Sequence, residues 1–160
     1  MIIAITGHRP DKLPDAETGW TIPNPTYIKV CKELKRVFVE QKPDKIICGM
    51  SLGADVYAAN IANILGIPFI AAVPFEGQER LWQEQDQKRY RKLLTQAEEV
   101  KIISPGGYSV DKMHTRNEWM VMNCDKVLAV WDGSKGGTAS CIHFAKMMRK
   151  EIIRIDPTKL

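Results

Sequence analysis

The residues best suited to chemistry lie in a glycine-rich run near the end of the chain. The run reads Trp131-Asp132-Gly133-Ser134-Lys135-Gly136-Gly137-Thr138 and follows a short apolar segment. Glycines let a backbone approach a phosphate closely and adopt positive φ. A helix that begins after the run directs its first N–H groups at an anion, and Thr138 could cap that helix or donate its hydroxyl to a phosphate oxygen. The run therefore predicts a phosphate-binding loop over residues 133–138.

Three further turn-forming segments also follow apolar runs. They are Gly7-His8-Arg9-Pro10, Gly49-Met50-Ser51-Leu52-Gly53-Ala54-Asp55 and Pro74-Phe75-Glu76-Gly77-Gln78. In an open parallel sheet the carboxyl ends of the strands share one edge, where ligands bind. Several such turns at one edge favour a binding site over purely structural turns.

The elements that must position these turns alternate along the chain. Short runs rich in Ile and Val, typical of buried strands, cover residues 2–6, 45–48, 68–73, 100–103, 126–131 and 151–155. Segments with helical periodicity cover residues 27–41, 52–65, 78–97, 111–124 and 137–150. This alternation predicts one α/β, Rossmann-like domain over residues 1–160, with three layers and helices on both faces of a mostly parallel sheet. The proline-rich residues 10–25 are predicted to form an ordered loop or lid.

Composition and charge exclude several classes of protein. The 160 residues, with 44% hydrophobic and 26% charged, suit one soluble domain. The net charge of +4 and the scattered cations disfavour nucleic acid as a partner, and the basic residues 88–92 are predicted to be a solvated helix face. No run approaches the roughly 20 apolar residues of a membrane span, and the start lacks the pattern of a signal peptide. We therefore expect a cytoplasmic protein that does not bind membranes.

Metal and covalent chemistry are not indicated. The four cysteines are far apart and form no Cys-x-x-Cys pair, which favours buried reduced thiols over a metal site. Cys141 and His143 stand two apart in a predicted helix and so point about 200° apart, which does not form a dyad. There is no strict Gly-x-Gly-x-x-Gly after the first strand and no Gly-Lys-Ser/Thr, so dinucleotide dehydrogenases and P-loop NTPases are disfavoured. No cofactor is expected.

The motifs resemble those of a known superfamily. Residues 49–55, followed by Ala58-Ala59-Asn60, resemble a helix start of the DNA-processing protein A family. Met113-His114-Thr115-Arg116-Asn117, the strand after it and Gly136-Gly137-Thr138 resemble the Lonely-guy, or lysine-decarboxylase-like, phosphoribohydrolases. Both belong to the SLOG superfamily of Rossmann-like nucleotide-binding proteins. The opening Gly-His-Arg-Pro, and Pro-Phe-Glu-Gly-Gln with the later Trp82, are similar to its YpsA-like branch.

The resemblance implies a ligand-binding set on both walls of a crevice. The set is Gly7, His8, Arg9, Gly49, Ser51, Gly53, Gln78, Trp82, Arg116, Asp132, Gly133, Ser134, Gly136, Gly137 and Thr138. Thr138 and the two glycines before it would hold a phosphate, Arg116 would contact phosphate or sugar, and Trp82 would stack on a base. Purely structural roles stay open for three residues. Trp82 could belong to the core or cover it, and Arg116 could pair on the surface with Glu118 or Asp111. For Asp55, a helix cap is preferred over a ribose contact.

One departure from the superfamily pattern bears on catalysis. Active phosphoribohydrolases carry Gly-Gly-x-Gly-Thr-x-Glu-Glu, in which a glutamate assists cleavage of the N-glycosidic bond. Here Ser140 and Cys141 follow Thr138-Ala139, and neither replaces a carboxylate as acid or base at neutral pH. If the protein is an enzyme, the candidate catalytic residues are Glu118 and Asp132.

Three functions are therefore weighed. The favoured one is binding of a nucleotide or a phosphoribosyl- or ADP-ribose-like compound, for sensing or sequestration. The alternative is hydrolysis of the N-glycosidic bond of a nucleoside phosphate, and the third is a single-stranded DNA-binding module, which the dispersed charge disfavours. The resemblance also implies a homo-oligomer.

Overall fold

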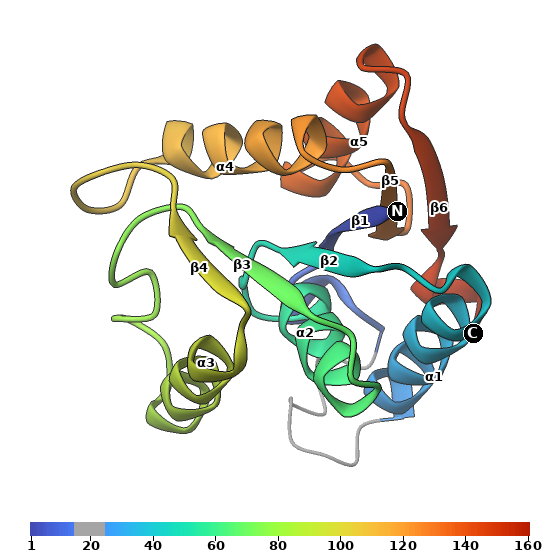
Figure 1. The fold of residues 1–160 in the computed structure, drawn as a ribbon, viewed down its shortest axis with the longest axis horizontal. Helices are drawn as coiled ribbons and strands as arrows, with labels where there is room; N and C mark the ends of the chain where they lie inside the picture. The colour runs from blue at the N-terminus through green and yellow to red at the C-terminus, as the bar shows by residue number, and fades with distance from the viewer. Residues whose placement is uncertain (15–24) are drawn as a thin grey trace.

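The computed structural model describes residues 1–14 and 25–160, in which strands and helices alternate (Figure 1). The strands are β1 (Ile2–Gly7), β2 (Lys45–Cys48), β3 (Phe69–Val73), β4 (Glu99–Ile102), β5 (Lys126–Val130) and β6 (Glu151–Ile155). The helices are α1 (Pro25–Gln41), α2 (Ala54–Ile64), α3 (Glu84–Gln96), α4 (Val110–Met122) and α5 (Gly137–Met147), with short 3-10 helices η1 (Pro10–Lys12) and η3 (Pro157–Lys159). The predicted α/β class is confirmed.

The six strands form one sheet in the order β4-β3-β2-β1-β5-β6, and all its neighbouring pairs are parallel. The chain builds outward from β1 in one direction through β4, then returns to the other side of β1 with β5. The strand order therefore reverses between β1 and β5, where Gly7 stands opposite Val130. At such a reversal the connections leave the two carboxyl ends in opposite directions and open a crevice between them.

Two helical layers cover the sheet: α1, α2 and α3 lie on one face, and α4 and α5 on the other (Figure 1). Because side chains alternate along a strand, Ile3 and Ile5 of β1 enter the core beneath the first layer, and Ala4 enters the core beneath the second. The first core includes Leu34 of α1 and Ala58 of α2. This is the three-layer arrangement predicted from the alternation.

The main difference from the sequence-based elements lies before α3. The periodicity predicts a helix over residues 78–97, whereas α3 begins at Glu84 and residues 76–81 form turns. Gly77 adopts a φ of 79°, a left-handed conformation that interrupts a right-handed helix. Of the loop predicted over residues 10–25, the first part is η1, and residues 15–24 lie outside the described part of the chain.

Candidate functional site

A crevice of about 550 Å³ opens at the carboxyl ends of β1, β2 and β5. The β1–η1 segment, the loop between β2 and α2, α4, and the start of α5 all contribute to its walls. The lining residues are Thr6, Gly7, His8, Arg9, Asp11, Lys12, Ser51, Asp55, Tyr108, Val110, Met113, His114, Arg116, Asn117, Ser134, Lys135, Gly136, Gly137, Thr138, Ala139 and Ser140. The crevice therefore lies at the reversal of strand order, where a parallel sheet of this kind holds its ligands.

The start of α5 forms one wall of the crevice. Gly136 is the N-cap with a φ of 143°, no side chain caps the helix, and its first turn has no acidic residue. The N–H groups of Gly137, Thr138 and Ala139 have no intrahelical acceptor at this position, and the helix dipole adds positive potential. Thr138 is 9% exposed and lines the crevice, and no hydrogen bond of its hydroxyl occurs within the described residues. This wall can accept an anion.

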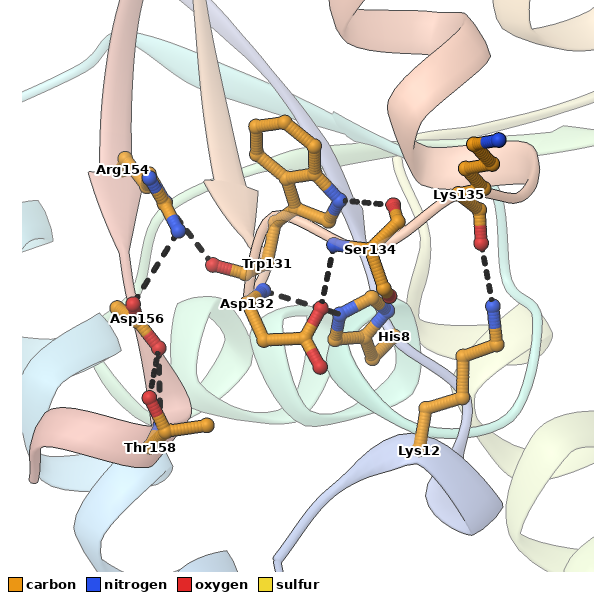
Figure 2. Close-up of polar contacts among 9 residues, drawn as sticks. All are labelled: His8, Lys12, Trp131, Asp132, Ser134, Lys135, Arg154, Asp156 and Thr158. Atoms are coloured by element: carbon orange, nitrogen blue, oxygen red, sulfur yellow. Dashed lines mark hydrogen bonds and ion pairs between the residues drawn. The ribbon is translucent and has the colours of Figure 1, made fainter.

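A polar network fixes the loop that leads into α5 (Figure 2). The Asp132 carboxylate accepts a hydrogen bond from the Ser134 N–H at 2.8 Å, and its Oδ1 lies 2.7 Å from Nε2 of the buried His8. The hydrogen bonds from Ser134, with a smaller contribution from His8, hold the pKa of Asp132 well below its usual value. Asp132 is absent from the crevice lining. On sequence grounds Asp132 is a catalytic or ligand-binding candidate. In the structure its carboxylate instead holds the shape of the loop.

A second brace comes from β6, the last strand. Arg154 Nε donates to the Trp131 carbonyl at 3.0 Å, and its guanidinium lies 4.9 Å from the centroid of the Trp131 ring (Figure 2). The Trp131 indole in turn donates to the Ser134 carbonyl at 2.8 Å. Sequence reasoning missed Arg154, although a cation within an apolar strand run was a visible signal. Gly133 lies in this braced part of the loop, with a φ of 95°.

Lys12 joins the two loops that face each other across the crevice. Its ammonium group donates to the Lys135 carbonyl at 2.8 Å, so η1 is tied to the loop before α5 (Figure 2). Lys12, Lys135 and Arg9 are exposed cations of the lining. The first two are functional candidates that sequence reasoning missed, because their contact spans 123 residues of sequence. With the buried Arg116, these cations outnumber the lining carboxylates of Asp11 and Asp55, so the crevice favours an anionic ligand.

Arg116 lies inside the wall. It is 4% exposed, and Nη1 donates to the Gly49 carbonyl at 2.5 Å, while Nε donates to Asn117 Oδ1 at 2.8 Å. Burial lowers the pKa of this guanidinium, and the charge of Asp55 opposes that shift. Surface pairing with Glu118 or Asp111 is therefore excluded. Arg116 borders the crevice, and its donors hold the loop after β2. Its contact with phosphate or sugar stays a prediction.

Asp55 is a buried carboxylate of the opposite wall. It is 6% exposed, and its Oδ2 accepts the Ser51 N–H at 3.2 Å. Oδ1 is buried and has no hydrogen-bond partner among the described residues. Burial raises the pKa of this carboxyl to about 6, and the nearby Arg116 acts in the opposite direction. The preferred interpretation, in which Asp55 caps a helix, is wrong. Within the described residues no side chain caps α2, and the Asp55 carboxylate instead accepts the N–H of Ser51 in the loop that precedes α2.

The other predicted wall residues hold this loop from outside the crevice. Gln78 Nε2 donates to the Met50 carbonyl and to the Tyr90 hydroxyl, both at 3.2 Å. Trp82 packs edge-on against Tyr90 with ring centroids 5.1 Å apart, and it lines a separate hollow that Gly53 also borders. A Cβ at Gly49 would lie 2.7 Å from Arg116 Nη1, so a larger residue there would displace the Arg116 side chain. The crevice lining contains none of these four predicted residues, which are Gly49, Gly53, Gln78 and Trp82.

Glu118 and Cys141 add no acid or nucleophile to the crevice lining. Glu118 is exposed on α4 and is absent from the lining. Among residues 1–14 and 25–160, the carboxylates that border the crevice are those of Asp11 and Asp55. Burial raises the pKa of the Cys141 thiol to about 11, so the thiolate is disfavoured at neutral pH. No helix in the described residues is long and apolar enough to span a bilayer.

Comparison with known proteins places this geometry in a family. A family model described as the YspA SLOG family matches residues 3–157. The SPβ prophage-derived protein YoqJ of Bacillus subtilis is 32% identical over 143 residues, which cover 77% of this chain and 84% of YoqJ.

Solved structures of DNA processing protein A share the fold. The protein from Streptococcus pneumoniae superposes with a TM-score of 0.67 at 16% identity, over 96% of this chain and 50% of that one. This chain therefore spans half the length of that neighbour. The protein from Helicobacter pylori, described by its single-stranded DNA binding mode, gives a TM-score of 0.64 at 19% identity, over 99% of this chain and 70% of that one.

Proposed function

Because the chain belongs to the YspA SLOG family, we propose that it binds a nucleotide or nucleotide-derived ligand whose phosphate lies at the start of α5. The observation that carries this proposal is the uncapped start of α5, where Gly137, the buried Thr138 and Ala139 line the crevice with N–H groups that have no intrahelical acceptor. Helix starts of this kind are common phosphate sites, because the N–H groups and the dipole act on the same anion. Sensing or sequestration of the ligand is the corresponding role.

The charges around the crevice support an anionic ligand. Arg9, Lys12 and Lys135 are exposed at the crevice, whereas Arg116 is held by the wall. The volume of about 550 Å³ lies within the usual range for sites that take a cofactor-sized molecule. A nucleoside phosphate fits both the size and the charge.

Binding is preferred over N-glycosidic hydrolysis because of where the two candidate catalytic carboxylates lie. Glu118 is exposed on α4 outside the crevice lining. Asp132 is engaged by Ser134 and His8 at the base of the loop. A general acid must come within hydrogen-bond reach of the bond it helps to break, and neither residue borders the space where a ligand lies.

A second candidate function is binding of single-stranded DNA across the same crevice. The observation in its favour is the likeness in fold to the Helicobacter pylori protein. That structure is described as one of a single-stranded DNA binding mode. This likeness weakens the expectation that nucleic acid is disfavoured. A strand would place successive phosphates near the exposed cations, so its affinity should fall steeply with salt.

The decisive experiment compares ligands on the wild type and on Gly137→Asp. Isothermal titration with AMP, ADP-ribose and oligo(dT) is expected to show binding of a mononucleotide by the wild type. Gly137 has no atom within 4 Å of a built Cβ, and a carboxylate at a helix start is favourable, so the variant should fold. It should lose AMP affinity at least tenfold, because the new carboxylate occupies the phosphate position and repels the phosphate.

Gln85→Glu is the matched control, since it adds the same charge to the first turn of α3, away from the crevice. It should bind AMP like the wild type. Equal affinities for all three proteins, or no binding of any ligand, would contradict the phosphate site. Salt-sensitive binding of oligo(dT) without mononucleotide binding would favour the second candidate function.

A further inference from the structure

The carboxylate of Asp55 carries an acceptor that the fold leaves unused. Asp55 borders the crevice, is 6% exposed, and directs Oδ2 to the Ser51 N–H. Its Oδ1 is buried without a hydrogen-bond partner among the described residues. A buried acceptor without a hydrogen bond destabilises a fold by roughly 1–3 kcal/mol. This cost suggests that Oδ1 of Asp55 has a partner outside the chain.

Backbone and a buried cation surround the Asp55 carboxylate. A Cβ at Gly49 would lie 2.9 Å from Asp55 Oδ2, so the backbone packs directly against the carboxylate. Arg116 holds that same loop through the Gly49 carbonyl, and its positive charge favours the ionised form of Asp55. The wall therefore holds an unused acceptor close to a buried cation.

The sheet sets the distance between this acceptor and the phosphate site. Asp55 follows β2 and α5 follows β5, and β1 lies between these two strands. Two strand spacings of about 4.8 Å separate them, which gives a span of roughly 10 Å. Gly7, which ends β1, lines the crevice between the two walls and adds no side chain of its own there. A pentose phosphate with a hydrogen bond at each end has a length of this order.

We propose that Asp55 accepts a hydrogen bond from a sugar hydroxyl of the ligand whose phosphate lies at α5, so that the crevice selects phosphorylated sugars over phosphate alone. This inference rests on the proposed phosphate site and adds the group that recognises the other end of the ligand. Since Oδ1 is covered in the structure, the hydroxyl reaches the carboxylate when the Asp55 side chain turns toward the crevice. The hydroxyl donates, and the carboxylate accepts.

The test uses ligands that share a phosphate and differ in hydroxyls. Titration calorimetry on the wild type should show ribose 5-phosphate bound at least tenfold more tightly than propyl phosphate. Asp55→Asn keeps the shape of the side chain but replaces one acceptor oxygen with a donor. It should bind ribose 5-phosphate as weakly as propyl phosphate, while its affinity for propyl phosphate stays within twofold of the wild type.

Asp11→Asn is the matched control, because Asp11 also borders the crevice but is exposed on η1. It should keep the preference for ribose 5-phosphate. Equal binding of the two phosphates by the wild type overturns the inference and needs no variant to fold. So does an Asp55→Asn protein that keeps the preference. Absence of binding for both phosphates would instead count against the phosphate site itself, which Gly137→Asp tests separately.

Discussion

Arg116 of α4 donates a 2.5 Å hydrogen bond from Nη1 to the carbonyl oxygen of Gly49, which follows β2. The same nitrogen lies 3.5 Å from the carbonyl of Ala72 in β3. One buried guanidinium thus joins a helix to the ends of two neighbouring strands and supports the wall that carries Asp55. Its contribution to the site is structural support for the crevice from behind.

Replacement of Arg116 by Met should destabilise the protein by about 3 kcal/mol or more. The variant removes several buried donors at once and leaves the Gly49 carbonyl and the Asp55 carboxylate without their cation. Arg36→Met is the control, because Arg36 makes only exposed pairs with Glu33 and Glu40. It should change stability by about 0.5 kcal/mol or less. Urea unfolding measures both, and equal losses would show that Arg116 does not support the wall.

Adjacent glycines at the start of α5 should respond to alanine with opposite signs. Gly136 has a φ of 143° and ψ of −162°, a conformation nearly restricted to glycine, so Gly136→Ala should cost roughly 1–3 kcal/mol. Gly137 begins the helix with no atom within 4 Å of a built Cβ, so Gly137→Ala should stabilise by about 0.4–1 kcal/mol. Thermal unfolding of the pair checks this. A similar loss in both would mean that the loop has another conformation in solution.

Neutralisation of Lys12 should weaken phosphate binding without unfolding the protein. Lys12→Gln retains a donor for the Lys135 carbonyl but removes one exposed charge at the crevice, so AMP affinity should fall roughly two- to fivefold at low salt. The difference should shrink at high salt. Lys29→Gln serves as the control for loss of charge, because Lys29 lies on α1 and its ammonium group donates to the carbonyl of Leu160. Calorimetry at two ionic strengths measures both variants, and an unchanged affinity in Lys12→Gln would remove Lys12 from the site.

The raised pKa of Asp55 predicts how stability depends on pH. Burial raises this pKa from 3.8 to about 6, so between these values the folded protein binds more protons than the unfolded chain. Its contribution to stability is therefore present near pH 4 and lost as the pH rises through 6. Relative to the wild type, Asp55→Asn should gain roughly 2 kcal/mol between pH 4 and pH 7. Urea unfolding at both pH values tests this, and a constant difference would place Asp55 in a more polar setting.

Local patterns in the sequence were sufficient for the elements and for the glycine loop. Apolar runs that alternate with helical periodicity depend on neighbours a few residues away, and they located all six strands. The conformations of Gly133 and Gly136 and the start of α5 are equally local, which is why the loop was recognisable. The start of α3 was predicted too early, because Gly77 breaks the helix in a way that periodicity does not register.

The direction of the polar side chains was decided only by the tertiary structure. Asp132 turns toward His8, 124 residues earlier in the chain, and Gln78 turns toward the Met50 carbonyl, so neither borders the crevice. Which strand lies beside which determines the neighbour that each of these groups finds, and the strand order cannot be read from periodicity. The sequence thus determined an α/β chain with a glycine-rich loop of known position. The order of strands around β1 then decided that Lys12 and Asp55 border the crevice beside that loop, while Glu118 and Asp132 do not.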